Sequence, residues 1–184
     1  MTHIDIPDSV TGIGDSAFSG CTGLTSIEIP DSLTKIGNAA FKGCTRLTSI
    51  GIPDSLKEIG ESAFWFCRGL THIEIPNSVT EIGKSAFEGC SGLTSIEIPD
   101  SVTEIGSDAF DGCTCLKWII LNITNKIPAY SETFIENVLR KLRNSQVKLT
   151  VNIPIGTGYA YRHYPHFDQD RLEFIPCIRP KRID

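Results

Sequence analysis

The seven cysteines are the residues of this chain with the greatest capacity for chemistry. Five of them recur at a constant step of 23 residues, and these are Cys21, Cys44, Cys67, Cys90 and Cys113. Thiols can bind a metal, exchange electrons or form disulfides, but no Cys-x-x-Cys motif occurs, and Cys113-x-Cys115 alone is a poor zinc signature. We therefore expect the regularly spaced cysteines to be buried, reduced thiols that pack as small apolar side chains.

Histidines are the next candidates for chemistry. His163 and His166 could bind a metal together, but a tyrosine and a proline stand between them and the motif is weak. The sequence contains no nucleophile elbow, phosphate-binding loop or metal triad. It therefore predicts no catalytic residues, no metal site and no cofactor.

The five cysteines belong to a longer repeat that must position them. Isoleucine, proline, phenylalanine and cysteine keep the 23-residue step five times, in the pattern L-x-x-I-x-I-P-x-S-[VL]-x-x-I-G-x-x-A-F-x-x-C-x-x. A fixed period in this range is typical of a solenoid with one coil per repeat. We expect I-x-I to form a strand with its isoleucines inward, I-G to form a second extended segment, and A-F-x-x-C to form a short helical turn that places Phe in the core. Coils about 4.8 Å apart would stack these residues in ladders of Ile, Phe and Cys.

The last third of the chain departs from this repeat. Asn122 replaces the proline of the sixth copy, and SETFIENVLRKLRN (131–144) has the apolar periodicity of a helix. KLTVNIP and RLEFIPCI regain the strand pattern, so the span from Leu121 to Ile153 would form one longer coil of 32 residues instead of 23. We predict five repeats and the start of a sixth over 1–121, and an atypical repeat with a helix and a C-terminal cap over 122–184.

The stretch LTSIEIPDSVTEIGSDAFDGC is similar to the repeats of the BspA-like leucine-rich repeat family. The resemblance covers residues 1–121 closely and extends loosely to 151–165. It implies an α/β repeat solenoid, a right-handed superhelix with parallel strands, short helical turns and a C-terminal cap. It also implies a non-catalytic protein-binding module that serves adhesion or recognition at the cell surface or in secreted form. An intracellular adaptor or effector module is the alternative.

The charge distribution bears on the partner and the location. Residues 1–118 carry 16 acidic and 7 basic residues, whereas residues 119–184 carry 6 acidic and 10 basic ones. An acidic repeat region argues against nucleic acid as the main partner, and no apolar run is long enough to span a membrane. The start of the chain has neither the basic nor the apolar region of a signal peptide. A cytoplasmic location therefore stays open beside the surface location that the resemblance implies.

Two acidic columns mark the expected binding face. The first lies between the two isoleucines of each strand and the second follows each proline; their members are Asp5, Glu28, Glu74 and Glu97, with Gly51 as a gap, and Asp8, Asp31, Asp54, Asn77 and Asp100. Like charges side by side on neighbouring strands are mildly destabilising. We interpret the columns as a surface for a basic protein partner, with solubility and edge protection as the alternative. His72 and Trp118 share a neighbouring row and would add a pH-dependent contact and an aromatic anchor.

The third copy of the repeat breaks the pattern with Trp65 and Phe66. The other copies carry a polar or charged residue and then glycine at these two positions. Neighbouring side chains point apart, so both rings cannot easily enter the core, and we expect at least one of them to be an exposed contact residue. A local packing variant is the alternative.

The open side of the first coil is a further expected contact surface. No unit precedes this coil in the sequence, and its apolar residues would be exposed; they are Ile4, Ile6, Val10, Ile13 and Phe18. Self-association or a longer solenoid at the N-terminal end would remove them from water.

Overall fold

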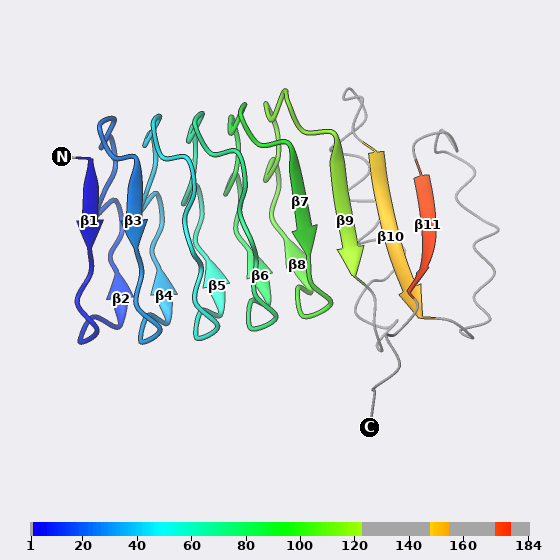
Figure 1. Ribbon diagram of the computed structural model, residues 1–184, viewed down its shortest axis with the longest axis horizontal. Helices are drawn as coiled ribbons and strands as arrows, with labels where there is room; N and C mark the ends of the chain where they lie inside the picture. The colour runs from blue at the N-terminus through cyan, green and yellow to red at the C-terminus, as the bar shows by residue number, and fades with distance from the viewer. Residues whose placement is uncertain (1, 123–147, 155–171, 178–184) are drawn as a thin grey trace.

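The computed structural model describes residues 2–122, 148–154 and 172–177, which form successive coils of parallel strands (Figure 1). The strands are β1 (His3–Asp5), β2 (Gly12–Ile13), β3 (Ser26–Glu28), β4 (Lys35–Ile36), β5 (Glu58–Ile59), β6 (Glu81–Ile82), β7 (Ser95–Ile98), β8 (Glu104–Ile105), β9 (Trp118–Asn122), β10 (Lys148–Pro154) and β11 (Leu172–Cys177). Each repeat makes one coil, as the 23-residue period predicted.

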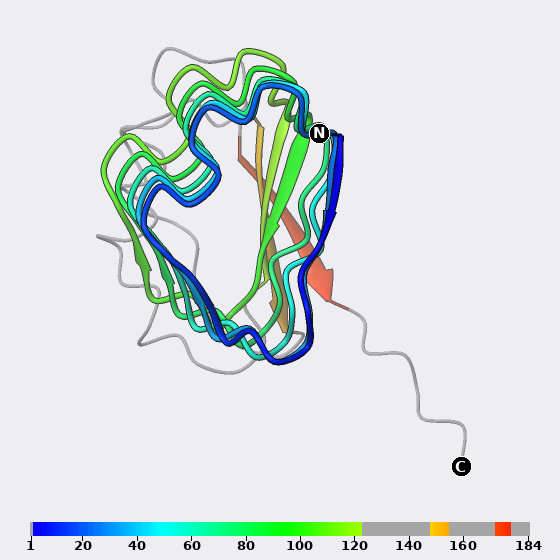
Figure 2. The ribbon, with the colours of Figure 1, turned by 90° about the vertical axis from the view of Figure 1, so that its left-hand side faces the viewer.

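The strands lie on two faces of the solenoid, which we name after the sequence motifs that form them. The I-x-I face contains β1 paired with β3, and a sheet in the order β11-β10-β9-β7. The I-G face contains β2-β4-β5-β6-β8. All pairs within these sheets are parallel and join equivalent residues of neighbouring coils, such as Ile4 with Ile27 and Ile59 with Ile82. A view along the solenoid shows the two faces on different sides of superimposed coils (Figure 2).

The I-x-I face is interrupted in the third and fourth coils. Between β3 and β7 its strand pairing is reduced to a single bridge that joins Glu74 to Glu97. Gly51 lies in this interval, and glycine weakens a strand because it has no side chain to pack and more backbone entropy to lose. The coils nevertheless stay in contact, since the Thr48 amide donates to the Thr25 carbonyl at 3.2 Å and the Thr71 amide to the Thr48 carbonyl at 3.2 Å.

The predicted short helical turns at A-F-x-x-C are not confirmed, and the described residues contain no helix. Consecutive hydrogen-bonded turns replace them: the Ala17 amide donates to Gly14 and the Cys21 amide to Phe18, each three residues back. Ser16 and Gly20 adopt positive φ values of 57° and 74°, so only three residues lie between two left-handed positions, too few for a helical turn. The amides of alternate residues, such as Phe18, donate instead to the next coil.

The predicted Phe ladder is confirmed. Neighbouring rings stack with centroids 5.3–5.7 Å apart and nearly parallel planes; the members are Phe18, Phe41, Phe64, Phe87 and Phe110. Three of the rings are completely buried, and the inward isoleucines, leucines and cysteines of the repeats complete the same core. This continuous column of apolar side chains positions both strand faces.

The glycine of the I-G motif is required by close contact between coils. A Cβ atom on Gly60 would lie 2.8 Å from the carbonyl carbon of Gly37, and one on Gly83 would lie 2.7 Å from the amide nitrogen of Glu61. Carbon atoms do not approach backbone this closely, so a larger residue would push the coils apart. Proximity of the preceding coil is therefore the reason that this position is glycine.

The two C-terminal strands continue the I-x-I face. The strand patterns predicted in KLTVNIP and RLEFIPCI are confirmed as β10 and β11. The predicted register is wrong, because Leu121 pairs with Val151 rather than with Ile153. A shift of two residues leaves the same side chains inward, so alternation alone could not fix it. Leu149 then pairs with Leu172, which restores the 23-residue step. The helix predicted over 131–144 and the remainder of the predicted cap lie outside the described residues.

The first coil is less covered than the others. Ile4, Ile6, Val10 and Phe18 are only partly buried, whereas the equivalent Leu33 and Phe41 of the second coil are fully buried. The prediction was wrong for Ile13, which is 4% exposed because it packs into the same core as Ile36, its strand partner in the second coil.

Candidate binding faces

The predicted acidic column lies on the solvent side of the I-x-I face. Asp5 pairs in register with Glu28, and Glu74 with Glu97, and all four side chains are exposed. Inward isoleucines on either side of each acid fix this orientation, because successive residues of a strand point to opposite faces. Gly51 leaves the column open, since a Cβ there would meet no atom within 4 Å. The face thus presents carboxylates at the spacing of neighbouring strands, with one position of bare backbone.

The neighbouring row of the I-x-I face contains His72 and Trp118. His72 is exposed, and Trp118 is 37% exposed at the start of β9, where it pairs with Ser95. The row therefore adds an imidazole and an indole beside the carboxylates, and their roles in binding stay a prediction. The second predicted column, after the prolines, is exposed at Asp8, Asp31 and Asp54, and half-buried at Asp100.

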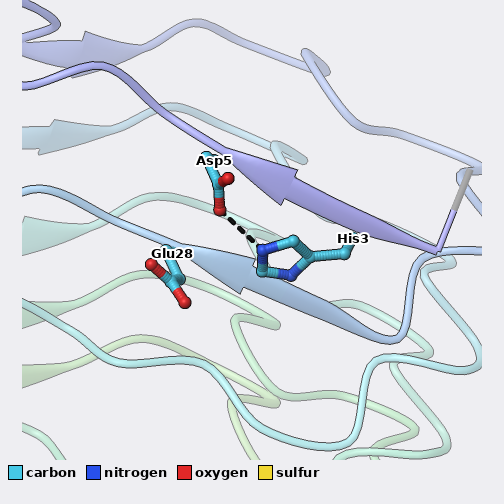
Figure 3. A group of neighbouring side chains, drawn as sticks. All are labelled: His3, Asp5 and Glu28. Carbon is cyan, nitrogen blue, oxygen red and sulfur yellow. Dashed lines mark hydrogen bonds and ion pairs between the residues drawn. The ribbon is translucent and has the colours of Figure 1, made fainter.

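A histidine and two carboxylates converge at the N-terminal end of this face (Figure 3). The ring of His3 makes an Nε2–Oδ1 contact of 2.6 Å with Asp5 and an Nδ1–Oγ contact of 2.9 Å with Ser26. One potential ligand atom from each of His3, Asp5 and Glu28 lies within 4.8 Å of the others. A nitrogen and two carboxylate oxygens form a donor set that zinc accepts. All three side chains are exposed, however, and exposed acidic groups commonly gather without a metal.

A further acidic column on the I-G face was missed by the sequence analysis. Glu58, Glu81 and Glu104 are exposed and in register on β5, β6 and β8. The signal was available, because E-I-G recurs at the same 23-residue step. The first two coils carry Gly12 and Lys35 in this row, so the column is acidic only in the last three repeats.

Trp65 and Phe66 form a half-buried aromatic pair outside both strand faces. Phe66 has a φ of 57°, in the left-handed region, at the position where the other four copies have Gly20, Gly43, Gly89 and Gly112 with φ values of 68–74°. A bulky side chain is rare in this conformation, which costs about 1–3 kcal/mol. The ring lies over the next coil, where a Cβ on Gly89 would be 2.9 Å from Phe66 Cδ2. The pair is therefore partly packed and partly exposed. This lies between the two alternatives that the sequence left open, an exposed contact residue and a local packing variant.

Two cations lie over these rings. Lys42 Nζ is 4.4 Å from the centre of the Trp65 ring, and the Arg68 guanidinium carbon is 5.0 Å from the centre of the Phe66 ring. The two rings are tilted by 55° with centroids 4.2 Å apart. Contacts of this length between a cation and an aromatic face are attractive. We call the group of Lys42, Trp65, Phe66 and Arg68 the aromatic ridge.

The cysteine column is a structural feature of the core. The five regularly spaced cysteines are free, and all but the half-buried Cys21 are buried, as predicted. Each buried thiol donates to the phenylalanine carbonyl of the preceding coil, as from Cys67 Sγ to the Phe41 oxygen at 3.0 Å. Burial raises the pKa of Cys44 to about 11 and that of Cys113 to about 12, and it also raises the pKa values of Cys67 and Cys90. Because a thiolate is the reactive species, this column is unsuited to nucleophilic or redox chemistry.

Parallel coils of fixed length, a shared core and regular polar rows define a repeat solenoid, whose side chains are presented in an ordered array. The chain belongs to the BspA type leucine rich repeat family, whose model matches residues 1–144 in six copies. No protein of curated function matches the chain in sequence.

Several solved structures share this fold. A leucine-rich repeat protein of T. pallidum is 29% identical with a TM-score of 0.65, over 82% of this chain and 72% of its own. A leucine-rich cell surface protein of Faecalibacterium prausnitzii is 37% identical with a TM-score of 0.65, over 71% of this chain and 34% of its own, so this chain spans only about a third of that relative. A leucine-rich repeat protein of Bacteroides ovatus is 24% identical with a TM-score of 0.60, over 94% of this chain and 59% of its own. This last likeness concerns the fold alone.

The part of the chain that the structure describes includes no helix with the length and apolarity needed to cross a bilayer.

Proposed function

We propose that this chain is a non-catalytic module that binds a protein partner at the cell surface or in secreted form, through the acidic column of its I-x-I face. The observation that carries the proposal is the exposed, in-register row of carboxylates beside Trp118 and Gly51. The family and the cell surface relative of Faecalibacterium prausnitzii support the location and the role.

The arrangement suits a basic partner. Glu28 and Glu74 form no ion pair among the described residues, so their carboxylates are available to cations from outside the chain. A solenoid holds its surface side chains on a rigid core, and little ordering entropy is lost when a large partner binds. Trp118 offers an aromatic anchor of the kind enriched at binding hot spots. The exposed backbone at Gly51 allows a partner to approach the strand closely.

Replacing Glu28, Glu74 and Glu97 together by glutamine is expected to slow association with the partner by about tenfold at low salt, since exposed charges chiefly steer the encounter. The difference between the variant and the original protein should shrink as salt is added, because the Debye length is about 10 Å at 0.1 M. The partner would be isolated from surface or matrix extracts, and its association rate would be measured by surface plasmon resonance over a salt series.

The matched control for this experiment is the Glu58→Gln, Glu81→Gln, Glu104→Gln variant, which removes the same number of charges from the I-G face. It should associate nearly as fast as the original protein. If both variants slow association equally, the association rate depends on the net charge of the protein and not on the I-x-I face. If neither changes the association rate or its salt dependence, the I-x-I face is not the binding surface.

We further infer that the open side of the first coil is an association surface, either for a second copy of this chain or for a preceding coil of a longer solenoid. The partly buried Ile4, Ile6, Val10 and Phe18 lie there, beside edges of β1 and β2 that pair with no other strand of the described residues. Burial of such side chains in an interface would stabilise the association by about 25 cal/mol of free energy for each Å² of apolar surface.

Sedimentation velocity of the chain should therefore show a concentration-dependent dimer. Ile6→Lys should shift it to monomer, whereas Thr103→Lys, at an exposed site in the fifth repeat, should leave the dimer intact. A monomer at every concentration would contradict self-association and leave a longer solenoid as the explanation.

A further inference from the structure

We propose that the aromatic ridge binds a short acidic peptide segment of a partner protein. This site is separate from the acidic I-x-I face, and it has the opposite charge. The four side chains of the ridge lie in two neighbouring coils, and the amide of Gly43 joins these coils by donating to the Trp65 carbonyl at 2.7 Å.

The first argument is that the cations of the ridge are positioned but not neutralised. Lys42 and Arg68 are exposed, and each lies over the face of one ring. The ion pair found among the described residues joins His3 and Asp5, so no carboxylate of this part of the chain neutralises Lys42 or Arg68. An aromatic ring contacts a cation on one side only, and the other N–H groups of the cation form no hydrogen bond with the ring. Those donors are available to carboxylates, which arginine binds with paired N–H···O contacts.

The second argument is the setting of these cations in an acidic surface. Residues 1–118 contain 7 basic residues against 16 acidic ones, and two of the seven, Lys42 and Arg68, meet at the ridge. Nucleic acid is a poor occupant because the acidic columns on the two strand faces would repel its phosphates. A short peptide is small enough to engage the ridge without meeting those columns.

The third argument is the backbone of Phe66. Four of the five copies place glycine at this left-handed position, and only the third copy places a large ring there. Strained backbone of this kind is concentrated at functional sites. Phe66 also covers Gly89 and contacts Trp65, so the two rings support each other at the surface. Two adjacent half-buried rings give an apolar floor between two cations, a surface that complements a peptide with carboxylates and an apolar side chain.

The test uses the Trp118→Phe background, in which Trp65 is the one remaining tryptophan of the chain. The probe is a synthetic peptide with Glu at alternate positions and Leu, Ser and Gly between them. Saturable change of the Trp65 emission is expected with this peptide. A peptide with Gln in place of Glu should bind about tenfold more weakly, because exposed charge pairs contribute modestly and two of them would be lost.

Variants of the protein identify the site. Lys42→Gln with Arg68→Gln should weaken binding of the acidic peptide about tenfold, and Phe66→Gly, which restores the glycine of the other copies, should weaken it without unfolding the chain. Glu58→Gln with Glu81→Gln should leave binding unchanged or slightly tighter. Circular dichroism would check that each variant is folded.

Three results would overturn the proposal. The first is the lack of a saturable signal with the acidic peptide, and the second is equal affinity for the Glu and Gln peptides. The third is a change of Trp65 emission with protein concentration alone, which would assign the ridge to a second copy of the chain. None of these results affects the I-x-I face, whose test uses different residues and a different partner.

Discussion

Truncation of Phe64 to alanine is expected to lower the free energy of unfolding by about 3–5 kcal/mol. The ring is completely buried and stacks between Phe41 and Phe87, with both centroid distances at 5.4 Å and interplanar angles of 4° and 2°. Its removal would leave a cavity in the middle of the ladder, and the coils on either side are joined by backbone hydrogen bonds that prevent collapse onto the gap. Urea unfolding followed by circular dichroism would measure the loss.

Phe18→Ala is the matched control for this prediction. Phe18 is only partly buried and stacks on one ring rather than two, so the same truncation should cost clearly less. Equal losses at the two positions would show that the ladder contributes no more in its middle than at its end. A loss below about 1 kcal/mol for Phe64→Ala would show that the core repacks around the site.

The sequence was sufficient to predict how the repeats stack, but not the local backbone of each turn. The 23-residue step of Ile, Phe and Cys predicted one coil per repeat, parallel strands and a stack of phenylalanines. Each of these features follows because every coil has the same sequence pattern, so that equivalent residues of neighbouring coils stack on one another. The exposed position of the acidic column followed from the same alternation of the strand.

The features that sequence reasoning missed depend on backbone conformation. Ser16 and its equivalents adopt positive φ although they are not glycine, and this shortens the expected helical segment to hydrogen-bonded turns. Serine, alanine and aspartate occur at these positions, so the repeat carries no single residue type that signals the conformation. The register of β10 was predicted wrongly for a related reason. Val151 and Ile153 lie on the same face of the strand, so the alternation allowed either of them to pair with Leu121.

Trp65 and Phe66 show how far the sequence alone can predict a candidate site. The sequence showed that Trp65 and Phe66 break the repeat, but not which way either ring points. Phe66 keeps the left-handed backbone of the glycine that it replaces, so its ring is directed over Gly89. That orientation brings it under Arg68, and Lys42 reaches Trp65 from the preceding coil. The contact of Lys42 with Trp65 joins the same position of neighbouring repeats, 23 residues apart, so spacing could have suggested it. The contact of Arg68 with Phe66 follows from the unusual φ angle of Phe66, which spacing does not reveal.

Stability is expected to fall steeply in alkaline solution between about pH 9.5 and 11, by up to about 5 kcal/mol for each pH unit, because each of the four buried thiols contributes up to about 1.4 kcal/mol per unit. In the unfolded chain the thiols ionise near pH 8.5. In the folded chain burial raises the pKa of Cys44 to about 11 and that of Cys113 to about 12, and raises those of Cys67 and Cys90 as well. The folded state therefore keeps protons that the unfolded state releases. The stabilisation is complete below about pH 8.5 and is lost as the pH rises towards the folded pKa values.

The contribution of the thiols is separated from that of lysine and tyrosine by comparing variants over pH 8–10.5, about the range in which the unfolded thiols titrate. Cys67→Ala should lower stability at neutral pH, because it removes a buried thiol and the hydrogen bond that this thiol donates to the Phe41 carbonyl. Its stability should then fall less steeply than that of the original protein, by about 1.4 kcal/mol for each pH unit, since one proton fewer is released on unfolding. Cys115→Ala changes an exposed cysteine and should leave the slope unaltered. Parallel slopes for Cys67→Ala and the original protein, measured by urea unfolding under reducing conditions, would show that the core thiols do not control alkaline stability.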